Sequence, residues 1–375
     1  MTIRKILATL LALSMTLSLA ACGGNSTQTG TTQSEQTEQT EESSSVSDES
    51  ASDETTAENT ETETPADETE ASEPAEKVDI NLAALSGPTA LGMLDLLEKN
   101  ENGEAANNYN VTIANAPDEV TGKIISGELD IAAVPTNVAS TLYNKTEGQV
   151  QIAALNTMGV LYVLETGDTI QSVADLAGKT IYATGQGSTP EYALNLVLEK
   201  NGLTPGEDVE IVFAADNAEI APLLASGEAQ VALLPQPFVT SVLTQNENVR
   251  VALDLTEEWD KAVNGESGLT MGCVVVRKEF AEQNKEALDR FLDEYKQSVE
   301  TVTSEEGLAH AAELAEHYNI IKAAVAENAI PECNIVFVEG DEMQQIAGGF
   351  LQVLYDANPQ AVGGQLPNDD FYYKR

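Results

Sequence analysis

From residue 78 onward, short apolar runs alternate along the chain with stretches of helical periodicity. The apolar runs predict strands at 78–85, 110–114, 129–134, 150–155, 180–183, 209–213, 230–234, 249–253 and 274–276. The stretches between them predict helices at 89–97, 118–125, 137–143, 173–176, 191–200, 218–225, 238–244 and near Trp259. Beyond the last strand, an almost wholly helical chain is expected as far as Tyr355. Strands that alternate with helices in this way are typical of parallel α/β units.

The first 77 residues have a different pattern. Arg4 and Lys5 precede an apolar run from Ile6 to Leu19, which is too short to cross a bilayer and ends in small residues. This pattern indicates a secretory signal peptide at 1–21. Cys22 follows directly after Leu-Ala-Ala, which resembles a bacterial lipobox and implies cleavage before Cys22 and a lipid on its thiol. An ordinary signal peptide with an incidental cysteine is the alternative.

Between the cysteine and residue 77 the chain is dominated by Ser, Thr, Glu, Gln and Ala and has almost no apolar residues, with Lys77 as its one basic residue. Such a segment buries too little apolar surface to offset its chain entropy. Residues 22–77 are therefore predicted to be a lipidated cysteine followed by a disordered acidic linker. This lipidated linker would hold a folded domain outside the cytoplasm, anchored to the bacterial cell membrane without being embedded in it.

The charge and the reactive side chains exclude several functions. The 375-residue chain has a formal net charge of −44, which argues against nucleic-acid binding and against docking onto anionic lipids. Cys273 and Cys333 form neither a disulfide framework nor a metal motif. His310 and His317 lie about 10 Å apart along a helix, too far to share a metal. No catalytic residue, metal or cofactor is expected, because no nucleophile has an evident activating partner.

A series of short motifs in a fixed order carries a family resemblance. The motifs are Ala-Asp-Leu-Ala-Gly-Lys-Thr-Ile at 174–181, Gly-Gln-Gly-Ser-Thr at 185–189, Asn-Gly-Leu at 201–203, 224–232 with its counterpart 125–132, and the ending 363–373. Together with the lipobox-like Cys22 and the acidic linker, the order of these motifs resembles that in the extracellular solute-binding proteins of ABC importers, in the nitrate/sulfonate/taurine/pyrimidine-precursor group. The resemblance covers about residues 78–375, and no single motif in it is decisive.

The resemblance implies a type II periplasmic-binding-protein-like fold, in which two Rossmann-like α/β lobes are joined by two crossing strands with a ligand cleft between them. A helix-then-strand pattern does occur twice, at 122–134 and 224–234, as expected of two similar lobes. The chain is expected to cross near 159–165 and to return near 271–276. The predicted limits are 78–163 and 273–375 for lobe 1 and 164–272 for lobe 2. A single Rossmann-like enzyme domain is the alternative.

Ligands of parallel α/β sheets bind beyond the carboxyl ends of the strands. Four loops at such positions combine a hydroxyl or amide with a helix start, where unpaired N–H groups can bind a polar or anionic group. The candidate ligand-binding residues are Ser86, Gly87, Thr89, Thr136, Asn137, Asn156, Gly187, Ser188, Thr189 and Gln236. Bulky substitution of Thr136 or Ser188 is expected to abolish binding and leave the fold intact. The alternative is that these side chains are only helix caps.

The four loops contain no arginine or lysine, so the charge of the ligand stays open. Helix starts alone could hold a sulfonate-like or nitrate-like anion, although the acidic chain would slow the approach of an anion at low salt. A pyrimidine-like ring compound fits nearly as well. The predicted function is that of a monomeric, lipid-anchored binding protein that captures a small molecule by lobe closure and delivers it to an ABC permease.

Two other functions are compatible with this fold. One is an enzyme that resembles the menaquinone-pathway lyases or a pyrimidine synthase related to these binders. Those enzymes work inside the cell, and the synthase uses a cysteine-rich motif that is absent here, so the signal peptide favours binding. The other is a ligand-sensing partner of a membrane receptor.

Overall fold

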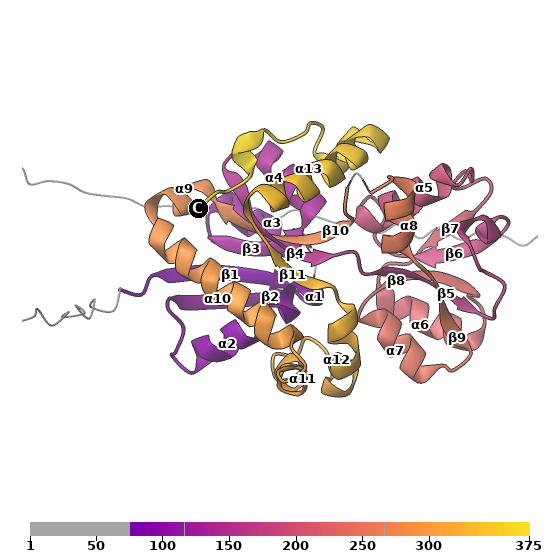
Figure 1. Cartoon of the computed structure of the whole chain (residues 1–375), viewed down its shortest axis with the longest axis horizontal. Coiled ribbons are helices and arrows are strands. Elements are labelled where there is room, and N and C mark those ends of the chain that lie inside the picture. The colour runs from indigo at the N-terminus through magenta and orange to yellow at the C-terminus, as the bar shows by residue number, and fades with distance from the viewer. Residues whose placement is uncertain (1–75, 116, 266) are drawn as a thin grey trace, which may run out of the picture. The chain divides into compact units, whose positions relative to one another are not determined.

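The computed structural model describes residues 76–115, 117–265 and 267–375, which form two α/β lobes, each built on one sheet (Figure 1). The predicted fold class is confirmed. The signal peptide, the lipid on Cys22 and the acidic linker up to residue 75 lie outside the described residues. Within the described ranges, no helix combines the length and apolarity needed to cross a membrane.

The first sheet has six strands in the order β11-β4-β10-β3-β1-β2. Their bounds are β1 Asp79–Leu85, β2 Asn108–Ala114, β3 Ile131–Pro135, β4 Val150–Met158, β10 Thr270–Arg277 and β11 Ile335–Val338. β1 pairs in parallel with β2 and β3, whereas β10 is antiparallel to β3 and β4.

The second sheet has five strands in the order β7-β6-β8-β5-β9. Their bounds are β5 Leu161–Thr166, β6 Thr180–Ala183, β7 Glu210–Phe213, β8 Val231–Pro235 and β9 Val249–Asp254. β6 is parallel to β7 and β8, and β5 is antiparallel to β8 and β9. The expectation of parallel units is therefore only partly right. β5 and β10 arrive directly from the other lobe, so each enters its sheet at the carboxyl ends of the parallel strands and runs back.

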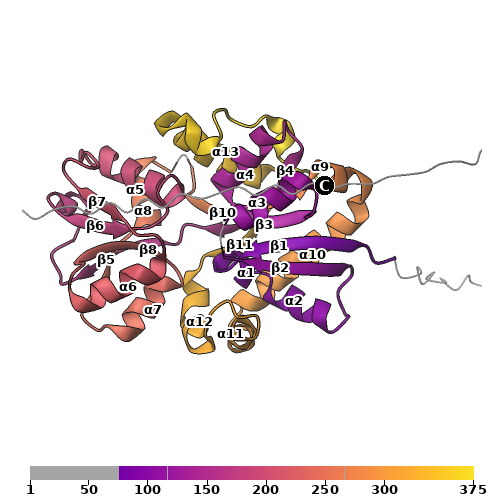
Figure 2. The same ribbon diagram turned by 180° about the vertical axis from the view of Figure 1, so that it is seen from behind.

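Helices cover both faces of each sheet, as Figures 1 and 2 show. On the first sheet, α3 (Pro117–Ser126), α4 (Thr136–Lys145) and α13 (Gly340–Ala357) pack on one face. The other face carries α1 (Pro88–Leu91), α2 (Leu94–Glu101), α9 (Lys278–Gln283), α10 (Lys285–Thr303), α11 (Leu308–His317) and α12 (Ala323–Ala329). On the second sheet, α5 (Thr189–Lys200) and α8 (Leu255–Ala262) oppose α6 (Asn217–Ser226) and α7 (Phe238–Gln245). The 3₁₀ helices are Val173–Leu176, Ile330–Glu332, Pro359–Val362 and Asp369–Phe371.

The strands are apolar on both faces because both faces are covered. Leu82 and Ala84 of β1 pack toward the α2 and α10 side, and Ala83 packs toward α3 and α4. All three side chains are fully buried. This explains why these strands appear in the sequence as continuous apolar runs.

Two elements differ from the expectation. β11 lies within the region expected to be helical, and the helix expected at 89–97 is split into α1 and α2 at Gly92 and Met93. A Cβ atom at Gly92 would lie 3.1 Å from both the Tyr295 hydroxyl and an Ile335 methyl carbon. The break between the two helices therefore coincides with a close approach of the chain to α10 and β11, where a side chain would have to displace its neighbours.

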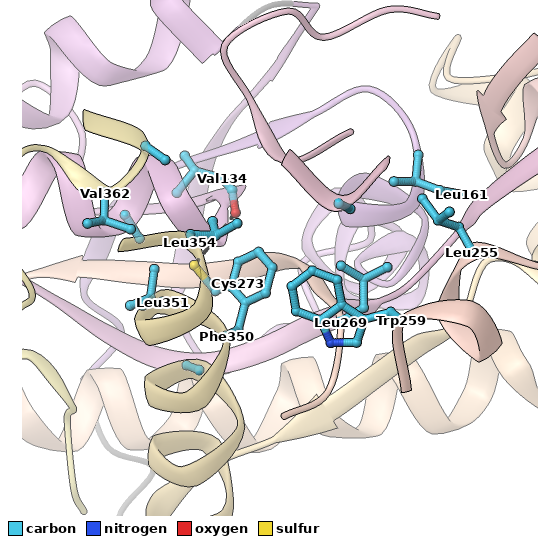
Figure 3. Close-up of a cluster of buried hydrophobic side chains, with 14 of the residues drawn as sticks. Val134, Leu161, Leu255, Trp259, Leu269, Cys273, Phe350, Leu351, Leu354 and Val362 are labelled. Carbon is cyan, nitrogen blue, oxygen red and sulfur yellow. Dashed lines mark hydrogen bonds between the residues drawn. The ribbon is translucent and has the colours of Figure 1, made fainter. Parts of the chain in front are cut away.

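The chain passes between the lobes after β4 and again before β10, and a buried aromatic contact also links the lobes. Trp259 of α8 is fully buried, and its ring centroid lies 5.8 Å from that of Phe350 of α13 (Figure 3). The indole N–H donates to the Ser267 carbonyl over 2.9 Å. The predicted lobe limits, 78–163 and 273–375 for lobe 1 and 164–272 for lobe 2, stay a prediction. Residues 161–163, which that prediction assigned to lobe 1, pair with β8 in the second sheet.

Candidate ligand-binding site

One cavity is lined by loops of both lobes. β1 leads into Ser86 and Gly87 of the first lobe, and β8 leads into Pro237 and Phe238 of the second. These residues enclose a cavity of 230 Å³ whose lining is completed by Ser241, Ile320, Ile321, Lys322 and Val325. Two of the four loops that the sequence singled out thus meet at one cavity, beyond the carboxyl ends of their strands.

The loop after β1 depends on the backbone of Gly87. Its dihedral angles, φ 128° and ψ −153°, lie in a region that is essentially reserved for glycine. A Cβ atom built on Gly87 would meet nothing within 4 Å, so the glycine is required by the backbone and not by crowding. The Ser86 N–H donates to the Ala114 carbonyl over 2.8 Å, which ties the loop to the end of β2.

The other two loops meet in a hydrogen bond between the lobes. The Thr189 hydroxyl, at the start of α5, donates to Asn137 Oδ1 at the start of α4 over 3.2 Å. Both residues are buried, and Asn137 Nδ2 also donates to the Ala361 carbonyl over 3.3 Å. The two lobes are therefore in direct polar contact where the carboxyl ends of β3 and β6 face each other.

The helix-cap alternative fits Gln236 alone among the candidate side chains whose contacts the structure gives. Among the described residues, the N-cap residues of α1, α4, α5 and α7 make no side-chain capping hydrogen bond. The Ser188 hydroxyl donates to the Gly185 carbonyl over 2.6 Å, and the exposed Gly187 N–H donates to Glu191. Gln236 Oε1 instead accepts from the N–H and the hydroxyl of Thr240, in the first turn of α7.

Several candidates lie behind the cavity wall and do not line the cavity. The Thr136 hydroxyl lies 3.1 Å from that of Thr270, and the Thr89 hydroxyl donates to the Leu85 carbonyl over 2.7 Å. Thr136 is fully buried, so a bulky side chain there would overpack its surroundings at a cost of about 1–3 kcal/mol. The expectation that such a variant keeps its fold stays a prediction. Ligand contact by Thr89, Thr136 and Gln236 stays a prediction.

Asn156, at the end of β4, lies in a tight buried environment. Its Oδ1 accepts from the Thr157 hydroxyl over 3.2 Å, while its Nδ2 has no hydrogen-bond partner among the described residues. A Cβ atom at Gly272 would lie 2.5 Å from Asn156 Oδ1, so the neighbouring strand leaves room for glycine alone. The residue is inaccessible in this arrangement of the lobes, and a role in ligand binding stays a prediction.

The part of the cavity wall that sequence reasoning missed comes from the loop between α11 and α12. Ile320, Ile321 and Lys322 belong to a region expected to be helical, and their only sequence signal is a pair of isoleucines. Lys322 Nζ lies 2.9 Å from Glu316 Oε1, and the Ala323 N–H donates to Oε2. The hydrogen bond from Lys322, with that from Ala323, lowers the pKa of Glu316.

The two cysteine side chains are packed in the interior, and the two histidine side chains pair with carboxylates at the surface. Cys273 and Cys333 are free and buried, and burial raises the pKa of the Cys333 thiol to about 12. His310 and His317 pair at the surface with Glu98 and Glu101. In the portion of the chain that the structure describes, no group of three or more His, Cys, Asp or Glu side chains is placed to hold a metal ion.

Larger hollows exist elsewhere in the described part of the chain, and those of 490, 380, 360 and 330 Å³ each lie within one lobe. The hollow of 360 Å³ contains Gly127 and Arg277, and the hollow of 380 Å³ contains Lys179 and Gln230. These residues lie at the amino ends of the parallel strands, opposite the edge where ligands of such sheets bind. The cavity between the lobes is therefore the candidate ligand-binding site.

The sequence matches one family model. Residues 105–328 match the model described as "ABC transporter, phosphonate, periplasmic substrate-binding protein". No curated protein sequence matches the chain.

Solved structures with the same fold cover most of the chain. A crystal structure of an ABC transporter protein from Parabacteroides distasonis is 24% identical, covers 79% of this chain and 99% of its own, and gives a TM-score of 0.67. The periplasmic aliphatic sulphonate binding protein SsuA from Escherichia coli is 14% identical, with 79% and 92% covered and a TM-score of 0.63. The alkanesulfonate-binding protein SsuA from Xanthomonas axonopodis pv. citri, bound to MOPS, is 16% identical, with 78% and 96% covered and a TM-score of 0.57. These similarities show the fold alone.

Proposed function

The chain belongs to the family of periplasmic substrate-binding proteins of phosphonate ABC transporters, and from this premise we propose that it captures a small molecule between its lobes and delivers it to an ABC permease. Proteins of this family are binding components of importers and not enzymes, and their place is outside the cytoplasm. The observation that carries the proposal is the cavity lined by Ser86 and Gly87 of one lobe and by Phe238 and Ser241 of the other.

Closure of the lobes would supply the signal to the permease. A ligand that touches both walls of the cavity stabilises the closed arrangement relative to the open one, and this differential affinity drives closure. Within the described residues the chain crosses between the lobes after β4 and before β10, so these connections are the proposed hinge. The Asn137–Thr189 hydrogen bond would form on closure and break on opening.

We also propose that the mature protein is a monomer held at the membrane by a lipid on Cys22, in the nitrate/sulfonate/taurine/pyrimidine-precursor group. The support is the lipobox-like sequence before Cys22 and the acidic segment after it. Replacement of Cys22 by alanine should move the protein from the membrane fraction to the soluble fraction. Equal membrane recovery of both forms would exclude the anchor.

The binding function is tested by thermal unfolding of the purified protein in the presence of phosphonates, alkanesulfonates, nitrate, bicarbonate and pyrimidine-type ring compounds. A ligand present at 100 times its Kd adds about 2.7 kcal/mol to the free energy of unfolding. For a domain of this size the midpoint should rise by about 5 °C. Small-angle scattering then measures closure as a reduced radius of gyration. A compound that raises the midpoint and is chemically converted would favour the enzyme instead.

A further inference from the structure

We propose that Asn358 is a positioning residue for lobe closure, because it fixes a 3₁₀ turn that holds Asn137 against Thr189 and also contacts Tyr192 directly. The inference rests on the proposed function and extends it to a contact between the lobes outside the cavity. We call the two hydrogen bonds, Asn137–Thr189 and Asn358–Tyr192, the closure latch.

The second lobe contributes one face of α5 to the closure latch. Thr189 and Tyr192 are three residues apart on this helix, so their side chains lie on the same face. The Thr189 hydroxyl donates to Asn137 Oδ1 over 3.2 Å, and one turn later the Tyr192 hydroxyl accepts from Asn358 Nδ2 over 3.4 Å. Two bonds one turn apart restrict the rotation of α5 relative to the first lobe as well as its distance from it.

The first lobe holds both of its latch residues through the 3₁₀ helix Pro359–Val362. Asn358 caps this helix, since its Oδ1 accepts from the N–H two residues further on over 3.0 Å. Within the helix, the Ala361 carbonyl accepts from Asn137 Nδ2 over 3.3 Å. Because the nitrogen of this amide is held by the 3₁₀ helix, its oxygen is held toward Thr189. Asn358 therefore affects both bonds of the closure latch.

The end of the 3₁₀ helix packs tightly against α4. The Val362 carbonyl accepts from the Ser140 hydroxyl over 2.8 Å and from Asn144 Nδ2 over 2.9 Å. A Cβ atom at Gly363 would lie 2.9 Å from the Thr141 Cα, so the chain approaches the helix closely here. These contacts lie within the first lobe and do not depend on the second. Opening of the lobes therefore breaks the closure latch and leaves the 3₁₀ helix in place.

The closure latch acts without help from a ligand. Its four residues are not among the described residues that line the cavity, so its bonds favour the closed arrangement whether or not a molecule is bound. A contact that is made in only one of two arrangements shifts their populations by its free energy. We therefore expect a closed population in the ligand-free protein, and Asn358 should determine its size.

Distances between two spin labels, measured by electron paramagnetic resonance, test the closure latch without a ligand. The labels are attached at Q352C on α13 and E199C on α5, two exposed positions on helices that contact each other across the lobes. The reference is the full-length protein with C22A, in which Cys273 and Cys333 are fully buried and inaccessible to the label. A population with the shorter, closed distance is expected.

N358A should lower the ratio of closed to open molecules about tenfold, and Y192F, which leaves the cap intact, about threefold. N358D should restore the reference ratio, because its carboxylate can accept both from the capped N–H and from the Tyr192 hydroxyl. N246A is the matched control. Asn246 is also half-buried, and its Oδ1 accepts from the N–H two residues further on over 3.1 Å, but it lies at the end of α7 within the second lobe. N246A should leave the ratio unchanged.

A double-mutant cycle tests whether Asn358 acts through Asn137. T189V removes the hydroxyl that Asn137 Oδ1 accepts from, so N358A should lower the ratio less in the T189V protein than in the reference. Fully additive effects of the two substitutions would overturn the positioning role.

Two further results would overturn the inference and leave the proposed binding function standing. One is a reference protein with no closed population, and the other is an N358A protein whose ratio is no lower than that of N246A. If N358A does not fold, Y192F decides in its place, and an unchanged ratio overturns the inference. A closure latch that behaves as expected in a protein that binds no compound of the thermal-unfolding panel would overturn the proposed function alone.

Discussion

The Thr189 hydroxyl donates a hydrogen bond to Asn137 Oδ1 over 3.2 Å and so joins the first turn of α5 in one lobe to the first turn of α4 in the other. The two residues occupy corresponding loops of the two sheets, after β6 and after β3. An interaction of this kind exists only while the lobes are together. It therefore contributes to the closed arrangement and not to the stability of either lobe.

T189V should weaken ligand binding about tenfold with little effect on the thermal midpoint. Valine keeps the volume of threonine but leaves Asn137 Oδ1 without this donor, and an unmet buried hydrogen bond costs about 1–3 kcal/mol. A loss of about 1.4 kcal/mol corresponds to tenfold in Kd. Isothermal titration calorimetry with the identified ligand measures it.

T180V is the matched control for T189V. The Thr180 hydroxyl donates to Glu210 Oε2 over 2.7 Å at the amino ends of β6 and β7, away from the cavity. It should leave Kd unchanged. Equal losses in the two variants would show that T189V acts through the second lobe and not through the contact between lobes.

W259F should lower the free energy of unfolding by about 2 kcal/mol. Phenylalanine leaves the buried Ser267 carbonyl without the indole N–H and leaves a void beside Phe350. Urea unfolding measures the loss. A double-mutant cycle with F350L should give a coupling of about 0.5–1.5 kcal/mol, as expected for an aromatic pair. Additive losses would show that the ring contact contributes nothing beyond packing.

The fold could be predicted where the sequence contains local signals. The strand at Thr180–Ala183 has the predicted bounds, because an apolar run with turn residues on both sides leaves few alternatives. β11 was missed because Ile335–Val338 is a four-residue edge strand whose pairing depends on β4, almost two hundred residues earlier. The direction of β5 and β10 was missed for a related reason, since it depends on where the chain crosses between lobes.

The site was predictable in part. Loops after β1 and β8 carry hydroxyl, glycine and proline signals, and both line the cavity. Ile320 and Lys322 carry no such signal, because their place at the cavity depends on how α11 and α12 pack against the rest of the lobe. Thr136 has the right residue type at a strand end, but it packs against Thr270, and only the assembled sheet reveals that it is buried.

E165Q should destabilise the protein by about 2 kcal/mol at pH 7, because charged hydrogen bonds in the folded state are lost. Burial alone would raise the pKa of Glu165, but hydrogen bonds from Thr169 and Ile170, with the charge of Arg250, outweigh it and lower the pKa below 4.5. Arg250 Nη2 lies 2.9 Å from the carboxylate.

A carboxylate with a lowered folded pKa stabilises the protein above its ordinary pKa, and that stability is lost as the pH falls through the folded value. The difference between wild type and E165Q should therefore be constant from pH 7 to about 4.5 and shrink below it. Urea unfolding at pH 7, 5 and 3.5 measures the difference. E199Q, at an exposed position on α5, should show no difference at any pH. A gap that stays the same from pH 7 to pH 3.5 would mean that the loss in E165Q does not come from the charge of the carboxylate.

G87A and G122A should change stability in opposite directions, although a Cβ atom at either position meets nothing within 4 Å. Gly87 has a backbone conformation that alanine adopts only with strain, so G87A should lower the free energy of unfolding by about 1–3 kcal/mol. Gly122 lies inside α3, where alanine is favoured over glycine by about 1 kcal/mol. G87A should also weaken ligand binding, because relief of the strain would move Ser86 away from the cavity. Urea unfolding gives both signs, and a G87A protein as stable as the wild type with unchanged Kd would mean that the loop needs no glycine.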